Sequence, residues 1–370
     1  MGPHPAARRQ ICEHFRARLI AGVPQGDQES GLSLLRRLSL EHDDLLFLEQ
    51  AARLLGFRSR FLQLEAGLNP SRMDLLDGGG LSLVRLEFSR RTFISGPKPP
   101  GRVFCNLTLR AAQEQPRVHG RRLDAETLVG FDPQREIHYQ APPGHSFAVL
   151  LVDEPLFWQT ATAMGRCDLE PDVLAANAFR THPACSGDLR RLLCQAFQAP
   201  TGPPGDAGQS WSTSRLMRDD LLPLLIAAIE TPNCHHGMAS SRNDRLLITE
   251  LSRRLIEERL DDTISMRTLY SAIPTSRRTL VYAFDEIFGM APMRFLRLQR
   301  LEAARRALTR AEPGSTTVAV IAQRHGFASP SHFARLYRHH FGEVPGDTLL
   351  QRQRFLGWSM SSRVAQRAAK

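Results

Sequence analysis

The sequence is poor in lysine and has no long apolar run. Of its 48 basic residues, only Lys98 and Lys370 are lysines. The longest apolar stretch, Leu221 to Ile229, is broken by Pro223 and is about half as long as a segment that crosses a bilayer. Residues 1–9 are polar and basic, which does not fit a signal peptide. These absences predict a cytoplasmic protein with no membrane partner.

The sequence also lacks the common motifs of metal binding and catalysis. Its six cysteines show no paired spacing, and without an export signal we expect them to be reduced. The clusters Cys234-His235-His236 and His339-His340 have no partner pair at zinc spacing. There is no nucleophile elbow, phosphate-binding loop or dinucleotide fingerprint. We therefore predict no metal, no cofactor, no catalytic residue and no enzymatic activity.

One pattern occurs twice in the last third of the chain. The run S-R-R-T-L-V-Y-A-F-D-E-I-F-G-M-A-P covers residues 276–292, and S-P-S-H-F-A-R-L-Y-R-H-H-F-G-E-V-P follows 53 residues later, at 329–345. Each copy begins with a serine suited to an N-cap, continues with apolar residues three and four apart, and ends at a glycine suited to a left-handed helix stop. The pattern predicts two helices capped by Ser276 and Ser329.

A shorter segment with a small apolar face precedes each of these helices. The apolar residues are Met266, Leu269 and Tyr270 in the first copy and Val318, Ile321 and Ala322 in the second. A short helix, a turn and a second helix form the DNA-binding motif whose second helix enters the major groove. The sequence therefore predicts two helix-turn-helix motifs in tandem.

An amphipathic stretch at residues 292–310 separates the two motifs. One face carries Phe295, Leu298, Leu301, Ala304 and Leu308, and arginines cover much of the rest. We predict a single helix, roughly 25 Å long. Such a helix would set the two recognition helices about 34 Å apart, which is one turn of DNA.

The positive charge is concentrated in this part of the chain. Residues 242–354 hold 19 arginines and 12 acidic residues, so they contribute +7 to the net charge of +10. A GC-rich genome explains much of the preference for arginine over lysine, but not the position of the excess. A basic excess within one domain indicates phosphate contacts.

Residues 244–353 resemble the DNA-binding domain of the AraC/XylS transcriptional regulators. The matching residues are Arg300-Leu301, Ala304, Leu308, Ile321-Ala322, Gly326-Phe327, Ser329, Phe333-Ala334-Arg335, Phe341-Gly342 and Pro345. The first motif departs from the family pattern, with Tyr270 at a position for a small residue and Pro274 where glycine is common. The overall layout, including residues 81–104, is most similar to regulators of the ethanolamine-operon type.

The exposed sides of the two recognition helices are the predicted DNA-binding surface. The predicted contacts are Arg277, Arg278, Val281 and Tyr282 on the first helix, and Pro330, Ser331, Ala334, Arg335 and Arg338 on the second. The resemblance implies that Arg278, Val281, Tyr282 and Arg335 face bases. Because the two sets differ, we expect an asymmetric DNA site.

The first part of the chain is predicted to be rich in β-structure. A helix at residues 43–55, closed by Gly56, precedes short branched or aromatic segments separated by glycine and proline. The predicted strands are 58–64, 81–88, 102–109, 127–131, 136–140 and 146–152. Frequent turns between short strands indicate a sandwich or barrel, and we expect a cupin-like jelly roll.

The predicted fold class is α+β. The β-rich region is followed by helices at 189–197 and 215–229, an exposed loop at 199–209 and a hinge at 231–241. The predicted division is an N-terminal extension (1–42), a β-rich sensor or dimerisation domain (43–153), a helical connector and hinge (154–240), a DNA-binding domain (241–355) and a basic tail (356–370).

The main functional hypothesis is a cytoplasmic, nucleoid-associated regulator that binds double-stranded DNA. The resemblance implies an activator that works with RNA polymerase. The β-rich domain would bind a small-molecule effector or form a homodimer. Its candidate effector contacts, each of which also fits a solvent-facing strand residue, are Arg85, Glu87, Arg90, His138, Tyr139 and His145. One alternative is a DNA-binding scaffold that only dimerises. Another is a cupin-type metalloenzyme, for which His138 and His145 lack a third ligand.

Overall fold

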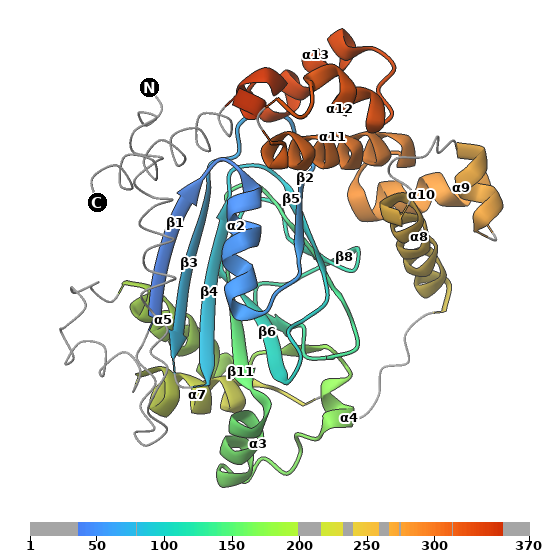
Figure 1. Ribbon diagram of the computed structural model, residues 1–370. Helices are drawn as coiled ribbons and strands as arrows, with labels where there is room; N and C mark the ends of the chain where they lie inside the picture. The colour runs from blue at the N-terminus through green and yellow to red at the C-terminus, as the bar shows by residue number, and fades with distance from the viewer. Residues whose placement is uncertain are drawn as a thin grey trace, which may run out of the picture. The chain divides into compact units, whose positions relative to one another are not determined.

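The computed structural model of the chain describes residues 36–78, 80–198, 216–231, 240–258, 266–273, 275–312 and 314–350 (Figure 1). The predicted loop at 199–209, the cluster Cys234-His235-His236, the basic tail and most of the hinge lie outside these residues. None of the described helices is both long and apolar enough to span a membrane.

The described strands form two antiparallel sheets. The larger sheet has the order β1-β3-β4-β11-β6-β9-β12, and the smaller has the order β2-β5-β10-β7-β8. The strands of the larger sheet are β1 (Arg36–His42), β3 (Ser71–Gly78), β4 (Leu81–Phe88), β6 (Arg102–Arg110), β9 (Thr127–Val129), β11 (Ser146–Asp153) and β12 (Ala178–Arg180). Those of the smaller sheet are β2 (Arg60–Gln63), β5 (Thr92–Gly96), β7 (Arg117–Val118), β8 (Arg121–Arg122) and β10 (Ile137–Ala141).

Strand β11 shows why the larger sheet needs cover on both faces. Side chains alternate between the two faces of a strand. Phe147 and Val149 line a cavity that residues of the smaller sheet also line. Ala148, Leu150 and Val152 belong to a core shared with helices. A strand buried on both sides requires an almost continuous apolar sequence, which β11 has.

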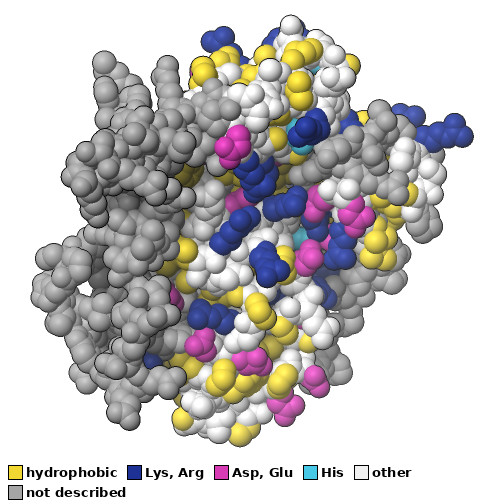
Figure 2. Space-filling view, in the orientation of Figure 1, with side chains coloured by type: hydrophobic (Ala, Val, Ile, Leu, Met, Phe, Trp, Pro, Cys, Tyr) yellow, Lys and Arg dark blue, Asp and Glu magenta, His cyan; other side chains and the backbone are white. Residues whose placement is uncertain are grey.

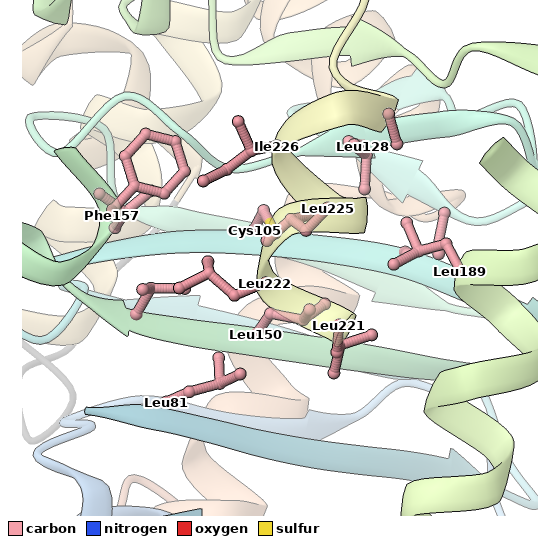
Figure 3. Packing of buried hydrophobic residues seen from close by; sticks show 14 of the residues in the cluster. Leu81, Cys105, Leu128, Leu150, Phe157, Leu189, Leu221, Leu222, Leu225 and Ile226 are labelled. Atoms are coloured by element: carbon pink, nitrogen blue, oxygen red, sulfur yellow. The ribbon is translucent and has the colours of Figure 1, made fainter. Parts of the chain in front are cut away.

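The helices that cover the second face of the larger sheet come after β11 in the chain, with strand β12 among them. They are α3 (Glu154–Ala163), α4 (Pro171–Leu174), α5 (Pro183–Gln198), the π-helix η2 (Leu216–Leu221) and α7 (Leu222–Ala228). Figure 3 shows Leu189, Leu222 and Leu225 of this layer together with Cys105 and Leu150 of the sheet. The predicted helical connector therefore packs on the sheet and shares its core.

The C-terminal helices form a second core. They are α8 (Ser240–Glu258), α9 (Met266–Ala272), α10 (Arg277–Phe288), α11 (Pro292–Arg310), α12 (Val318–Arg324) and α13 (Pro330–Phe341). This core also contains Leu62, Leu64 and Phe93 of the β-rich region. The smaller sheet and the C-terminal helices therefore bury apolar side chains against each other.

The predicted α+β fold is confirmed, and the linker helix is found at the predicted residues 292–310. The helix predicted at 43–55 is present as α2 (Leu45–Ala52) and a 3₁₀ turn, η1 (Arg53–Leu55), and it ends at Gly56 with φ of 83°. All six predicted strands are found, with ends shifted by up to two residues. The cupin-like topology and the domain limits stay predictions.

Six further strands were not predicted from the sequence. They are β1, β3, β5, β7, β8 and β12. Strand β1 pairs with β3 along its whole length, so the β-structure begins within the predicted N-terminal extension. Strand β3 has no apolar alternation that would reveal it, because its buried residues include Asp74. Asp74 is paired there with Arg72 and Arg85.

Replacing Leu150 tests whether the core between the larger sheet and its helices dominates stability. Leu150 is fully buried, so Leu150→Ala should lower the free energy of unfolding by about 2–5 kcal/mol. The measurement is urea unfolding of the full chain. Leu54→Ala, at a position 46% exposed, is the matched control and should have little effect. Equal losses for the two variants would contradict this placement of the core.

Candidate nucleic-acid interface

Helix α13 has a serine cap at its start and a glycine at its end. The Ser329 hydroxyl accepts a hydrogen bond from His332 N at 3.3 Å, and Pro330 occupies the first turn, where a missing N–H costs little. Gly342 ends the helix with φ of 77°, and its N–H donates to the carbonyl of Arg338.

Helix α10 is built in the same way. The Ser276 hydroxyl accepts from Thr279 N at 3.1 Å, and Gly289 ends the helix with φ of 67°. Leu280, Ala283, Phe284 and Phe288 are buried on α10, as are Phe333, Tyr337, His340 and Phe341 on α13. The two copies of the sequence pattern therefore produce two helices with matching buried faces.

The residues predicted to contact DNA lie on the opposite faces. Arg277, Arg278, Val281 and Tyr282 are exposed on α10, and Pro330, Ser331, Arg335 and Arg338 are exposed on α13. Ala334 is half-buried behind this face. Ser331, Arg335 and Arg338 are spaced four and three residues apart, so they form one stripe. Contact between these residues and DNA stays a prediction.

The relatives of this chain match mainly in its C-terminal part. A helix-turn-helix domain family model matches residues 269–351. The XylDLEGF operon transcriptional activator 2 of Pseudomonas putida is 33% identical over 96 residues, which are 26% of this chain and 61% of that protein. The HTH-type transcriptional activator RhaS of Escherichia coli O81 (strain ED1a) is 32% identical over 187 residues, 50% of this chain and 62% of that protein.

A solved structure of a probable AraC family transcriptional regulator from Rhodopseudomonas palustris CGA009 is 31% identical. It covers 29% of this chain and 98% of its own chain, with a TM-score of 0.27. The C-terminal region is an AraC-type DNA-binding domain. This chain spans about three fifths of the length of the two curated relatives. The closer likeness to regulators of the ethanolamine operon stays a prediction.

The first motif of the AraC-type domain can be compared with the second only in part. Its recognition helix is fully described, whereas Pro274 and the side chain of Tyr270 lie outside what the structure describes. In the second motif, the turn contains Gly326 with φ of 77°, and the Arg300 guanidinium lies 2.9 Å from the position of a Cβ atom there. A side chain at Gly326 would therefore be strained and would also displace Arg300.

The two histidines near the end of α13 have different environments. His339 is exposed, whereas His340 is 4% exposed and packs edge-on against Phe341. Burial lowers the pKa of His340 to about 4, and the nearby Arg305 acts in the same direction. His340 is therefore a neutral part of the core near pH 7.

Several arginines of the AraC-type domain are engaged in ion pairs. On the linker helix α11, Arg305 lies 3.0 Å from Glu343 and Arg306 lies 2.5 Å from Glu49. Arg253 and Arg254 on α8 both lie 2.7 Å from Glu250. Figure 2 shows Lys and Arg side chains interspersed with Asp and Glu side chains on one face of the molecule. The described Lys and Arg side chains therefore do not form one continuous basic surface on this face.

One group of side chains has distances that would suit a metal ion. One ligand atom each from Glu136, His138 and Glu250 lies within 4.8 Å of the others. However, Arg253 Nη2 lies 3.1 Å from Glu136 and 2.7 Å from Glu250. A second cation beside this guanidinium would be repelled, so the side chains fit an ion-pair cluster better than a metal site. The absence of a metal stays a prediction.

Of the six candidate effector contacts, only Tyr139 lines the cavity between the sheets. The cavity has a volume of about 40 Å³ and is mostly apolar. The Tyr139 hydroxyl lies 2.8 Å from Nε2 of the buried His145. Arg85 pairs with Asp74, and Glu87 pairs with Arg110. Arg90 is exposed, and His138 lies 3.1 Å from Glu250 of the AraC-type domain.

Stability should depend on pH through Glu302 of α11. Burial raises the pKa of Glu302 to about 7, against the opposing effect of Arg306 and Arg305. The folded chain then binds more protons than the unfolded chain between about pH 4.5 and 7, so stability falls as pH rises through this window. We expect Glu302→Gln to remove about 1–3 kcal/mol of this fall. The measurement is urea unfolding at several pH values between about 5 and 7.5.

The matched control is Glu312→Gln, at an exposed position that follows α11. It should leave the pH dependence of unfolding unchanged. A Glu302→Gln variant with the same pH dependence as the unmodified chain would show that Glu302 is ionised in the folded protein throughout this range.

Proposed function

We propose that this chain is a sequence-specific DNA-binding transcription regulator whose tandem motifs bind two successive major grooves. The observation that carries the proposal is the pair of capped helices α10 and α13 within an AraC-type domain. Their aromatic faces are buried, and their opposite faces expose Arg278 and Arg335. Exposed arginines on recognition helices can donate two hydrogen bonds to guanine in the major groove.

We infer activation rather than repression, with RNA polymerase as a partner. The support is that the two curated relatives are both called transcriptional activators. DNA as the ligand also favours a cytoplasmic, nucleoid-associated location.

We propose that the chain acts by binding and not by catalysis. The support is that Arg253 and Arg254 already pair with the two carboxylates beside His138.

For the β-rich region, we propose a role in sensing a small molecule or in forming a homodimer. The cavity between the sheets supports sensing. At about 40 Å³ it is close to the space of one or two water molecules. An organic effector would therefore have to move the sheets apart on binding, which would make its binding a conformational signal.

Arg335→Ala tests the predicted base contact on α13. We expect it to cost about 1–3 kcal/mol of binding to the preferred DNA and to relax the preference at one base position. The measurement is a competition assay with DNA selected from a randomised pool. Arg191→Ala is the control, because Arg191 is 65% exposed and pairs with Asp188 on α5. Unchanged base preference in Arg335→Ala would remove Arg335 from the proposed interface.

A footprint tests the tandem model itself. One monomer should protect two major-groove segments about 34 Å apart. Affinity should fall steeply as salt rises, because phosphate contacts release counterions. The measurement is chemical footprinting on the selected DNA at physiological salt. Protection of one short segment only would contradict simultaneous binding by both motifs.

A further inference from the structure

The smaller sheet contacts the first recognition helix at its C-terminal end. Arg117 of β7 donates from Nη1 to the carbonyl of Glu286, at 3.1 Å. Phe93 of β5 meets Phe288 edge-on, with ring centroids 5.0 Å apart. The last four carbonyls of a helix lack partners within the helix, and a cation there complements the helix dipole. Arg117 supplies both a donor and a charge.

The second recognition helix is contacted near its C-terminal end by residues at the end of the edge strand β2. The Nε2 atom of Gln63, at the end of β2, lies 3.1 Å from the carbonyl of His340 and 2.6 Å from the carbonyls of Glu65 and Gly67, so its two hydrogens are shared among three acceptors. The backbone N–H of Gly67 donates to the carbonyl of His340 at 2.9 Å. His340 is next to Phe341, which corresponds to Phe288 in the first copy. Each recognition helix is therefore contacted by the β-rich region at an equivalent position, near its own C-terminal end.

The linker helix has an anchor of its own on the β-rich region. Arg306 donates from both terminal nitrogens to the carboxylate of Glu49 on α2, at 2.5 and 2.6 Å. Glu49 is 3% exposed and also accepts from the backbone N–H of Phe61 in β2, at 2.7 Å. The middle of the AraC-type domain is thereby tied to the strand that carries Gln63.

The strand order of the smaller sheet fixes the distance between the two strands that contact the recognition helices. Gln63 lies on β2 and Arg117 on β7, which are separated by β5 and β10. Neighbouring strands are about 4.8 Å apart, so the two anchors are held roughly 14 Å from each other by backbone hydrogen bonds. The base-facing residues Arg278 and Arg335 stay exposed. The contacts hold the recognition helices in place without covering the predicted DNA surface.

We propose that the smaller sheet positions the two recognition helices relative to each other and so determines which spacing of half-sites the regulator accepts. Gln63 and Arg117 are then positioning residues for DNA binding. This proposal rests on the proposed function, because it concerns how the two motifs bind one DNA. It adds that the spacing preference depends on the β-rich region as well as on the linker helix.

The test is a series of DNA duplexes that differ in half-site spacing. The starting duplex is the site that the full chain selects from a randomised pool, and one or two base pairs are then inserted or deleted between its halves. For the unmodified chain, we expect a one-base-pair change to weaken binding about tenfold, as the loss of a base contact does. In the Gln63→Ala, Arg117→Ala double variant, this penalty should fall below about threefold, with base preference within each half unchanged.

Matched variants separate positioning from simple loss of structure. Arg110→Ala and Gln115→Ala change exposed side chains of the β-rich region and should keep the full spacing penalty. Arg117→Lys retains a cationic donor and should also keep most of it. If a thermal unfolding experiment shows that the double variant is not folded, the single variant Arg117→Ala replaces it. Its spacing penalty should then lie between those of the unmodified chain and the double variant.

The outcomes distinguish this proposal from the proposed function. If the unmodified chain binds none of the pool, the proposed function fails. If it binds with a spacing preference that the variants keep, the positioning role is wrong. A uniform loss of affinity at every spacing would also overturn that role, because it would mean that Gln63 and Arg117 only stabilise the fold.

Discussion

Burial of an aromatic stripe on each recognition helix is the constraint on which the rest of the DNA-binding region depends. Phe284 and Phe288 of α10 both pack on Phe295 of α11, the latter pair stacked with centroids 4.3 Å apart. In α13, Phe333 and Tyr337 are fully buried. Because these faces are fixed by burial, the opposite faces must point to solvent. The position of Arg278 and Arg335 on the surface is thus a consequence of apolar packing behind them.

The same packing leaves backbone carbonyls at the ends of the helices that need hydrogen-bond donors. In a domain on its own, water would hydrogen-bond to the carbonyls of Glu286 and His340. Here Arg117 and Gln63 do so. The β-rich region therefore contributes to the placement of both recognition helices. A change in its structure would reach them through these hydrogen bonds.

The sequence predicted local structure well and distant pairing poorly. The limits of α11 follow from a period of 3.6 residues and a proline at its start, which are both local signals. Strands such as β1 and β5 owe their existence to partners elsewhere in the chain, so their own residues carry little signal. The anchors were missed for the same reason, although Glu49 follows the buried Leu45 by four residues. A carboxylate on an apolar helix face indicates a hidden partner, here Arg306.

The smaller sheet has a different neighbour on each of its faces. Alternation along β5 and β10 directs Ile94 and Tyr139 to the cavity, whereas Phe93 and His138 contact the AraC-type domain. An effector in the proposed cavity would press on one face of a sheet whose other face contacts α10 and whose β2 end contacts α13. Since hydrogen-bonded strands resist separation, such a displacement would move the sheet as a unit. The proposed sensor would then act on the spacing between the helices and leave the bases that each helix reads unchanged.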